Sequence, residues 1–321
     1  MTEERRREGV SRAIRNAQTL LAQHFAQTPL VRAISLEAIN RAVFLKIESE
    51  LPTGSFKVRG AIYALSRQVE RSGKGPVIAA STGNHGAAVA WAGRLLNLPV
   101  TIFLPAQANP VKTRRILELG ARIVSVGNDL SAAIDAAHAE AERSGAFFLH
   151  DATDPDIPVG TATIGAEIVE QLPMADAIYV PMGDTALVRG VATAAKQLKP
   201  AIRIVGVAAA NAPAYYWSWR SGTAVSTDTA DTIADGLAVR RALELNVTAI
   251  SSLVDDVRVV EEEELLAAIS HLMTREGVTA EPAAAAATAA LMKDSDATGT
   301  IVALVTGSNV APDVMARITG R

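Results

Sequence analysis

The chain has 321 residues, of which 49% are hydrophobic and 20% charged, with a net charge of −3. This length is long for one domain and comfortable for two, and it can bury a large core. The weakly acidic balance gives no reason to expect nucleic acid or an anionic membrane as a partner. Zero cysteines exclude disulfides, thiolate nucleophiles and cysteine-ligated metals.

No segment predicts export or membrane insertion. The amino terminus mixes acidic and basic residues and lacks the apolar core of a secretory signal. The apolar stretch 283–290 is too short to span a bilayer, and Glu281 and Lys293 bracket it. We therefore expect a cytoplasmic protein with no membrane partner.

Apolar β-branched runs alternate with amphipathic helical patterns along almost the whole chain. In chain order, candidate strands lie at 42–47, 77–80, 100–104, 122–126, 147–149, 177–180, 202–207, 256–260 and 300–305. Between them the sequence predicts helices at 61–69, 85–96, 110–119, 130–143, 163–171, 187–198 and 261–275. Repeated strand–helix–strand order predicts parallel sheets that are covered by helices on both faces.

The order of elements predicts an α/β fold with two doubly wound parallel-sheet lobes. An Asp- and Pro-rich stretch at 150–158 marks the return from the smaller lobe. We predict a larger lobe made of residues 1–52 and 152–321 and a smaller lobe made of residues 53–151. Ligands of such folds bind at the carboxyl ends of the strands, here in the cleft between the lobes.

Lys57 lies in the segment Pro-Thr-Gly-Ser-Phe-Lys-Val-Arg-Gly, where a loop turns into a helix. The amine is therefore close to the amino end of a helix, where N–H groups and the helix dipole favour anions. In a dry, electropositive pocket the pKa of such an amine is lowered, so it is a nucleophile toward an aldehyde and later a base. A surface lysine after a turn is the alternative interpretation.

Further polar loops directly follow predicted strands. The loop 81–86 offers hydroxyls and N–H groups that suit a carboxylate, although Ser81 or Thr82 as a helix cap and His85 as a core group are sound alternatives. Backbone N–H groups of the loop 183–187 suit a phosphate, but Asp184 brings a negative charge there.

Two more segments complete the candidate site. Thr306 ends the last predicted strand, in a position to hydrogen-bond a ring nitrogen in the cleft. The segment Gly-Thr-Ala-Thr at 160–163 lies past the Asp- and Pro-rich loop, and we expect it to help hold a carboxylate.

Together these segments resemble the serine/threonine dehydratase branch of the fold-type II (tryptophan synthase beta-like) pyridoxal-phosphate enzymes. The likeness runs in order through residues 28–30, 48–60, 81–85, 234–237 and 306–309. Thr-Gly-Ser-Phe-Lys followed by Ser-x-Gly-Asn-His is highly specific, and the likeness spans nearly the whole chain. The resemblance implies pyridoxal 5′-phosphate as cofactor, an amino acid as substrate, and a homodimer.

The resemblance also implies a role for individual residues. Lys57 would join the cofactor aldehyde as a Schiff base, with Phe56 beside the ring, Asn84 at the ring hydroxyl and Thr306 at the pyridine nitrogen. The phosphate would be held by Gly183, Asp184, Thr185, Ala186 and Leu187. The substrate carboxylate would be held by Ser81, Thr82, Gly83 and His85, and the catalytic residues would be Lys57, Ser81 and Thr82.

The chain departs from the family pattern at several of these positions. Family members usually carry four glycines where this chain has 183–186, and Gly-Gln-Gly-Thr at 160–163. Most dehydratases have alanine at position 82, and related serine racemases have a serine there that handles a proton. Some relatives bind a divalent cation through two carboxylates in the segment that is 206–214 here. This segment has no acidic side chain, so we expect no metal there.

The implied activity is α,β-elimination from a serine- or threonine-like 3-hydroxy amino acid, which gives a 2-oxo acid and ammonia. Alternatives of the same fold are an amino-acid racemase, for which Thr82 is the candidate residue, and a β-replacement enzyme. A nucleotide-binding regulatory module is a remote alternative, because no strand is followed by Gly-x-Gly-x-x-Gly or by a Walker-type motif. No effector domain follows Thr306, so a role in amino-acid catabolism is expected.

Overall fold

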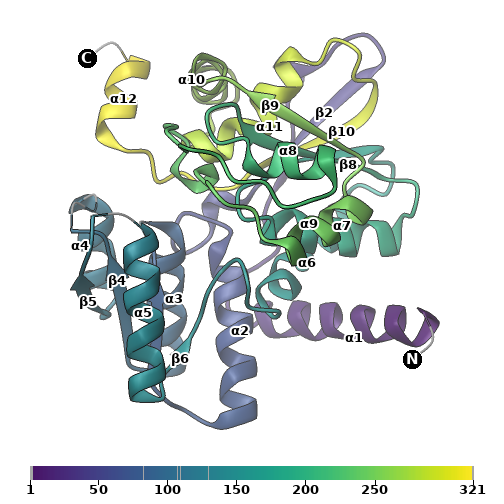
Figure 1. Ribbon diagram of the computed structural model, residues 1–321. Helices are drawn as coiled ribbons and strands as arrows, with labels where there is room; N and C mark the ends of the chain where they lie inside the picture. Colours follow the sequence, from purple (N-terminus) through teal and green to yellow (C-terminus); the bar gives the residue numbers. More distant parts are fainter. Residues whose placement is uncertain (1–2, 82, 107, 109, 129, 320–321) are drawn as a thin grey trace.

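Two sheets, each covered by helices, form the centres of two lobes (Figure 1). The computed structural model describes residues 3–81, 83–106, 108, 110–128 and 130–319. The larger sheet has the strand order β1-β2-β10-β7-β8-β9, with bounds Leu30–Arg32, Arg41–Ile47, Gly299–Val305, Ala177–Pro181, Arg203–Ala209 and Asp256–Val260. The smaller sheet has the order β5-β4-β3-β6, with bounds Arg122–Ser125, Val100–Leu104, Val77–Ala80 and Phe147–Phe148.

Alternate residues of the strands face opposite helical layers. In β10, Ile301 and Ala303 pack with α10 (Glu262–His271) and α11 (Pro282–Lys293), whereas Val302 packs with α6 (Ile157–Gln171) and α7 (Ala186–Leu198). In β4, Ile102 packs with α2 (Lys57–Ser72) and α3 (Asn84–Leu96), whereas Phe103 packs with α5 (Leu130–Ser144). Burial on both faces explains why these strands read as continuous apolar runs.

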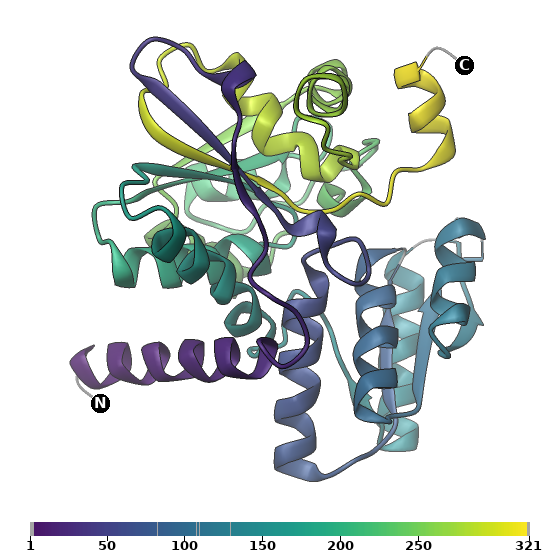
Figure 2. The same ribbon diagram turned by 180° about the vertical axis from the view of Figure 1, so that it is seen from behind.

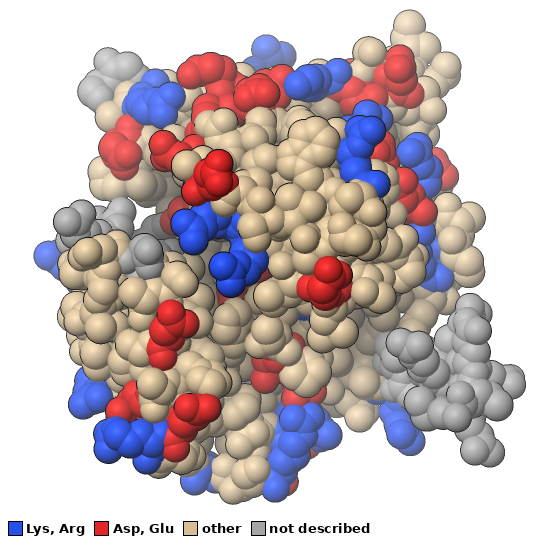
Figure 3. Space-filling view, in the orientation of Figure 1, with Lys and Arg blue, Asp and Glu red and all other residues tan. Residues whose placement is uncertain are grey.

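The remaining helices lie at the ends of the chain and around the larger sheet. The helix α1 (Glu3–Leu21) runs beside the larger lobe and meets α2 and α6, as both views show (Figures 1 and 2). The others are α4 (Pro110–Glu118), α8 (Ala214–Ser221), α9 (Glu244–Leu253) and α12 (Pro312–Thr319). None of the described helices combines the length and apolarity needed to cross a bilayer. Basic and acidic side chains are interspersed over the face in Figure 3.

The predicted fold class is confirmed, but several elements differ from the prediction, and α8, α9 and α12 were not predicted. Every predicted strand is present, but β1 adds an antiparallel edge strand that was not predicted. The helix α1 was also missed, because its first turns are densely charged and carry little apolar pattern. The helix α6 starts at Ile157 rather than at 163, since Pro158 in its first turn suits a helix start. The lobe boundaries at residues 52 and 151 stay a proposal.

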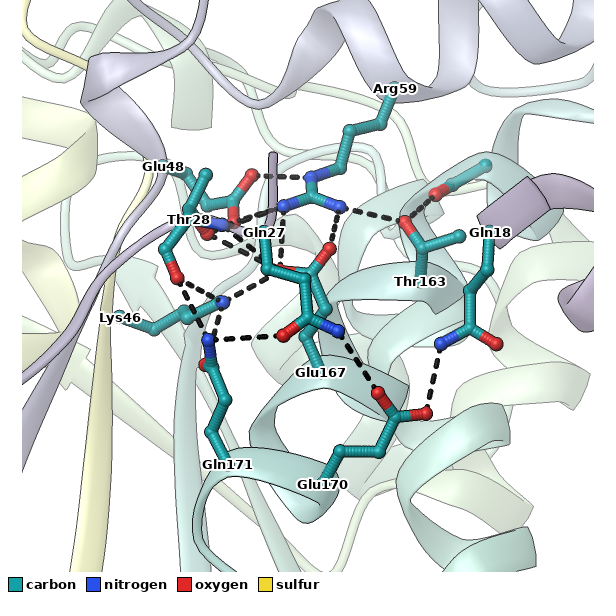
Figure 4. Close-up of polar contacts among 11 residues, drawn as sticks. Gln18, Gln27, Thr28, Lys46, Glu48, Arg59, Thr163, Glu167, Glu170 and Gln171 are labelled. Carbon is teal, nitrogen blue, oxygen red and sulfur yellow. Dashed lines mark hydrogen bonds and ion pairs between the residues drawn. The ribbon is translucent and has the colours of Figure 1, made fainter. Parts of the chain in front are cut away.

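A buried network of charges joins the start of α2 to the larger lobe (Figure 4). Arg59 donates through Nε and Nη2 to both carboxylate oxygens of Glu48, at 2.7 and 2.9 Å. Its Nη1 reaches Oε1 of Glu167 on α6 at 2.5 Å, and Lys46 Nζ on β2 reaches the other oxygen at 2.6 Å. The hydroxyl of Thr28 completes the network with a bond of 2.6 Å to Glu48. Two cations and two anions are thus paired in the interior of the protein, and Arg59 is 1% exposed.

Removing Arg59 leaves two buried carboxylates short of a partner. We expect Arg59→Met to lower the free energy of unfolding by about 3–5 kcal/mol, because breaking a buried ion pair strands the remaining charges. Urea denaturation followed by circular dichroism measures this change. The matched control is Arg67→Met on the same helix, since Arg67 pairs with the exposed Glu70 and such pairs contribute less than about 1 kcal/mol. Equal losses in the two variants would contradict this account.

Candidate active site

The backbone before Lys57 is held by the segment that follows β10. Phe56 N–H donates to the carbonyl of Thr306 at 3.0 Å, and Ser308 N–H donates to the carbonyl of Gly54 at 2.9 Å. Gly54 has a φ of 68°, and a Cβ there would lie 3.0 Å from the side-chain oxygen of Asn309. A glycine is therefore required at this turn. The pairing fixes Lys57 as the first residue of α2, at the carboxyl end of the larger sheet.

Two carboxylates surround the amine of Lys57. Its Nζ lies 2.8 Å from Oδ2 of Asp151 and 3.5 Å from Oδ2 of Asp184, and its side chain is 17% exposed. Burial opposes the charged amine, but the carboxylates of Asp151 and Asp184 outweigh burial and hold the pKa of Lys57 above its usual value. Burial likewise disfavours the charged form of Asp151, yet the Lys57 ammonium holds the pKa of Asp151 well below its usual range. The two carboxylates thus favour the ammonium form of Lys57.

The lowered pKa predicted for Lys57 is therefore wrong for the protein as it stands. That prediction rested on an electropositive pocket and overlooked Asp151. One signal was available: Asp151 follows β6 at its carboxyl end, and β6 pairs with β3 in the smaller sheet. In parallel sheets, ligands bind at the carboxyl ends of the strands. Asp151 is therefore expected on the same side as the loops that follow β3 and β7.

A hydrogen bond joins Ser81 to Gly83 in the loop after β3. The hydroxyl of Ser81 accepts from the N–H of Gly83 at 3.0 Å, and Gly83 rather than Ser81 is the N-cap of α3. His85 is 4% exposed, and one of its ring nitrogens pairs with the carbonyl of Leu149 at 3.2 Å. Burial lowers the pKa of His85, so the ring is neutral at pH 7. Thr82 lies outside the described residues.

Asn84 links this loop to the larger lobe. Its side-chain oxygen accepts from the amide of Asn309 at 2.7 Å, and its amide donates to Oε1 of Glu281 at 2.5 Å. Asn309 also donates to the carbonyl of Thr53, in the loop that precedes Lys57. The predicted site residues 56, 57, 84 and 306 thus come from three loops that touch one another. Their roles toward a ligand stay a prediction.

The loop 183–187 follows β7 and continues into the first turn of α7. Gly183 approaches the carbonyl of Gly236 so closely that a Cβ would lie 2.3 Å from that oxygen. Thr185 has a φ of 75°, and its buried hydroxyl has no hydrogen-bond partner among the described atoms. Oδ1 of Asp184 accepts from the N–H of Ala186 at 3.1 Å, so Asp184 caps α7, as its short distance along the chain allows.

The segment 160–163 does not form a carboxylate-binding loop. These residues lie inside α6, where Gly160 packs against the backbone of Arg59 and allows α6 to approach α2. The hydroxyl of Thr161 lies within hydrogen-bond distance of the carbonyls of Pro158 and Ala186, and that of Thr163 donates to the carbonyl of Gly160. These hydroxyls stabilise helix packing behind the loop 183–187. Within the described residues, no group of three or more His, Asp or Glu is arranged to hold a metal ion.

The left-handed conformation of Thr185 has a measurable cost in stability. A β-branched residue in this region is strained, whereas glycine adopts it freely. We expect Thr185→Gly to raise the free energy of unfolding of the cofactor-free protein by about 0.5–1 kcal/mol, measured by urea denaturation. Asn97→Gly is the matched control, because Asn97 has a φ of 56° but asparagine tolerates this region. A loss of stability in Thr185→Gly would contradict this prediction.

Comparisons with known proteins identify the family of the chain. The model of the family described as "Pyridoxal-phosphate dependent enzyme" matches residues 21–307. The chain is 36% identical to an L-threonine ammonia-lyase of Thermotoga maritima over 96% of this chain and 77% of the relative. It is 32% identical to the catabolic L-threonine dehydratase TdcB of Escherichia coli, over 87% and 86%.

Solved structures of similar proteins share the whole architecture. Maize serine racemase superposes with a TM-score of 0.90 at 29% identity, covering 96% of both chains. Threonine deaminase isoform 2 of Solanum lycopersicum superposes with a TM-score of 0.89 at 28% identity, covering 98% of this chain and 88% of that one. The fold, the loop around Lys57 and these matches lead to one assignment: the chain belongs to the family of pyridoxal-phosphate dependent enzymes.

Proposed function

We propose that the protein is a pyridoxal-phosphate-dependent ammonia-lyase that eliminates water from a 3-hydroxy amino acid, after which hydrolysis of the released enamine gives a 2-oxo acid and ammonia. The observation that carries this proposal is the amine of Lys57, which lies among loops from both lobes and is held by Asp151 and Asp184. Membership in the family supports the cofactor. The ammonia-lyase and dehydratase names of relatives at 32–36% identity support the reaction. A nucleotide-binding module, the remote alternative, does not agree with this membership.

The residues of the site fit the cofactor. The start of α7 brings backbone N–H groups beside the buried hydroxyl of Thr185, which has no partner among the described atoms, and such groups suit a phosphate. A Cβ at position 183 would meet the carbonyl oxygen of Gly236 at 2.3 Å, so a glycine is required for the loop to pack this closely. We propose that Gly183, Asp184, Thr185, Ala186 and Leu187 hold the phosphate.

Other residues would orient the ring. Phe56 lies beside Lys57, with the amine 5.4 Å from the centre of its ring. Thr306 is 3% exposed and offers a neutral hydroxyl, and Asn84 is fixed by Glu281 and Asn309. When bound, pyridoxal phosphate supplies an aldehyde that joins amines and a ring that withdraws electrons from Cα of the amino acid.

The protein's own groups would move the protons. We propose that the amine of Lys57 takes the proton from Cα and that a proton is returned to the departing 3-hydroxyl. Asp151 favours the protonated amine, so it stabilises the charge that Lys57 gains in this step. Ser81, Thr82, Gly83 and His85 are proposed to hold the substrate carboxylate, with the N–H groups at the start of α3 as donors.

Racemisation is the second candidate, because a serine racemase shares the fold at 29% identity. β-Replacement is a further alternative of the same fold. A homodimer in the cytoplasm, and a catabolic role, remain parts of the proposal that rest on the sequence resemblance.

The test uses purified protein with pyridoxal phosphate and L-serine or L-threonine. We expect formation of a 2-oxo acid and ammonia, and absorbance in the violet that disappears in Lys57→Ala, because alanine has no amine. Lys57→Arg is expected to lack both as well, because a guanidinium does not form an imine.

The matched control is Lys74→Ala, since Lys74 is exposed in the turn after α2. This variant should keep both the absorbance and the activity. Change in optical rotation without any 2-oxo acid would favour the racemase. Violet absorbance that persists in Lys57→Ala would overturn the assignment of Lys57.

A further inference from the structure

Asp151 places a carboxylate beside the amine of Lys57. Among the described residues, no second donor could take the place of that amine. Its oxygens lie 2.8 Å from Lys57 Nζ and 3.9 Å from Nδ1 of His150. That ring nitrogen already accepts from the N–H of Ala152 at 3.1 Å, so it does not donate to Asp151. Lys57 is therefore the hydrogen-bond donor to Asp151 within the part of the chain that the structure describes.

The charges around the amine are unbalanced toward the negative. Asp151 and Asp184 both face Lys57, and Glu281 lies behind Asn84. Arg189 is a further cation near the site, and its guanidinium donates to the carbonyl of Ala152 at 3.0 Å. A bound phosphate adds further negative charge. Counting Arg189, these groups are three carboxylates and two cations, so the described part of the site is short of positive charge.

The position of Asp151 connects this charge to the substrate. In the proposed reaction Lys57 Nζ reaches the hydrogen on Cα, so a carboxylate in contact with Nζ lies alongside Cα and the start of the side chain. The ring of His85 adds a second polar feature, because its Nδ1 is buried without a partner and Asp151 is close enough to influence its pKa. A substrate group at this place meets an anion and a neutral imidazole.

We propose that the substrate is a 3-hydroxy amino acid whose side chain ends in a positive charge, an ammonium or amidinium group, and that Asp151 binds this group. The inference rests on the proposed function and adds the substrate class. Once Lys57 is joined to the cofactor, its ammonium no longer balances Asp151. A cationic group on the substrate would then supply the positive charge that Asp151 faces. A methyl group would leave a largely buried carboxylate without a partner, and a carboxylate would be repelled by it.

Three substrates of nearly equal size test the charge directly. Threonine, 2,4-diamino-3-hydroxybutanoate and 3-hydroxyaspartate place a methyl, an aminomethyl and a carboxylate group on the same carbon. For the holoenzyme we expect the highest kcat/KM with the diamino acid and the lowest with 3-hydroxyaspartate. Asp151→Asn should lower kcat/KM for the diamino acid by about 10- to 100-fold, the usual range for a hydrogen bond to a charged group, mainly through KM. Threonine should be affected far less.

The matched control is Asp135→Asn, since Asp135 is exposed on α5 and should leave the ratios of the three substrates unchanged. A loss in Asp151→Asn that is equal for all three substrates would overturn the proposal, because it would mean that Asp151 acts on Lys57 alone. A wild-type preference for threonine that Asp151→Asn does not alter would overturn it as well.

A binding measurement separates this inference from the proposed reaction. The unreactive analogues 2,4-diaminobutanoate and 2-aminobutanoate lack the 3-hydroxyl, so calorimetry with the holoenzyme reports binding alone. We expect the diamino acid to bind more tightly, and Asp151→Asn to remove that difference. If this pattern holds while none of the three hydroxy acids gives a 2-oxo acid, the proposed function fails and the inference stands. Equal affinities in the wild-type protein would overturn the inference.

Discussion

The guanidinium of Arg59, buried between Glu48 and Glu167, determines where Lys57 lies. Arg59 is two residues beyond Lys57 in the first turn of α2, so the network that holds its side chain also fixes the start of that helix. Its partners come from the segment after β2 and from α6, which belong to the larger lobe. Arg59, Glu48 and Glu167 lie on separate elements. The direction of α2 is therefore defined once all three side chains are in contact. Full satisfaction of the network is what makes its burial tolerable.

A second constraint acts from the opposite side of the lysine. The segment after β10 hydrogen-bonds the loop before Lys57, and Asn309 bridges that loop to Asn84 on the smaller lobe. The amine is thus positioned by backbone on one side and by a charge network on the other. Rigid support of this kind favours a group that must meet its substrate in one geometry. The two carboxylates at the amine then decide its charge rather than its position.

Much of this arrangement could be predicted from the sequence, and the failures have physical causes. Continuous apolar runs such as Val77–Ala80 identify buried parallel strands, and the glycine-framed Lys57 identifies the site. The three-residue β1 was missed because its burial is slight and its pattern short. The segment 160–163 was misplaced because its glycine suggests a loop, whereas a close helix contact requires it.

Asp151 and Arg59 show a different limit. Asp151 pairs with Lys57, 94 residues away, and Arg59 pairs with Glu167, 108 residues away. No local sequence pattern predicts pairs that are so far apart. The loop after β6 could have been assigned to the site from the strand order alone. The direction in which an individual carboxylate points depends on packing that only the folded protein defines.

The central place of β10 has a consequence for how the protein is made. Gly299–Val305 pairs with β2 on one side and with β7 on the other, so β2 has no parallel neighbour until the last strand exists. Between the two strands the ribosome must translate roughly 250 residues, which takes on the order of 12–50 s at about 5–20 residues per second. During this time residues 41–47 lack the strand that pairs with them in the folded protein, and their apolar side chains stay exposed. The smaller sheet, whose strands lie within 77–148, has no such delay. Nascent chains stalled before residue 299 should accordingly engage chaperones through their amino-terminal segment.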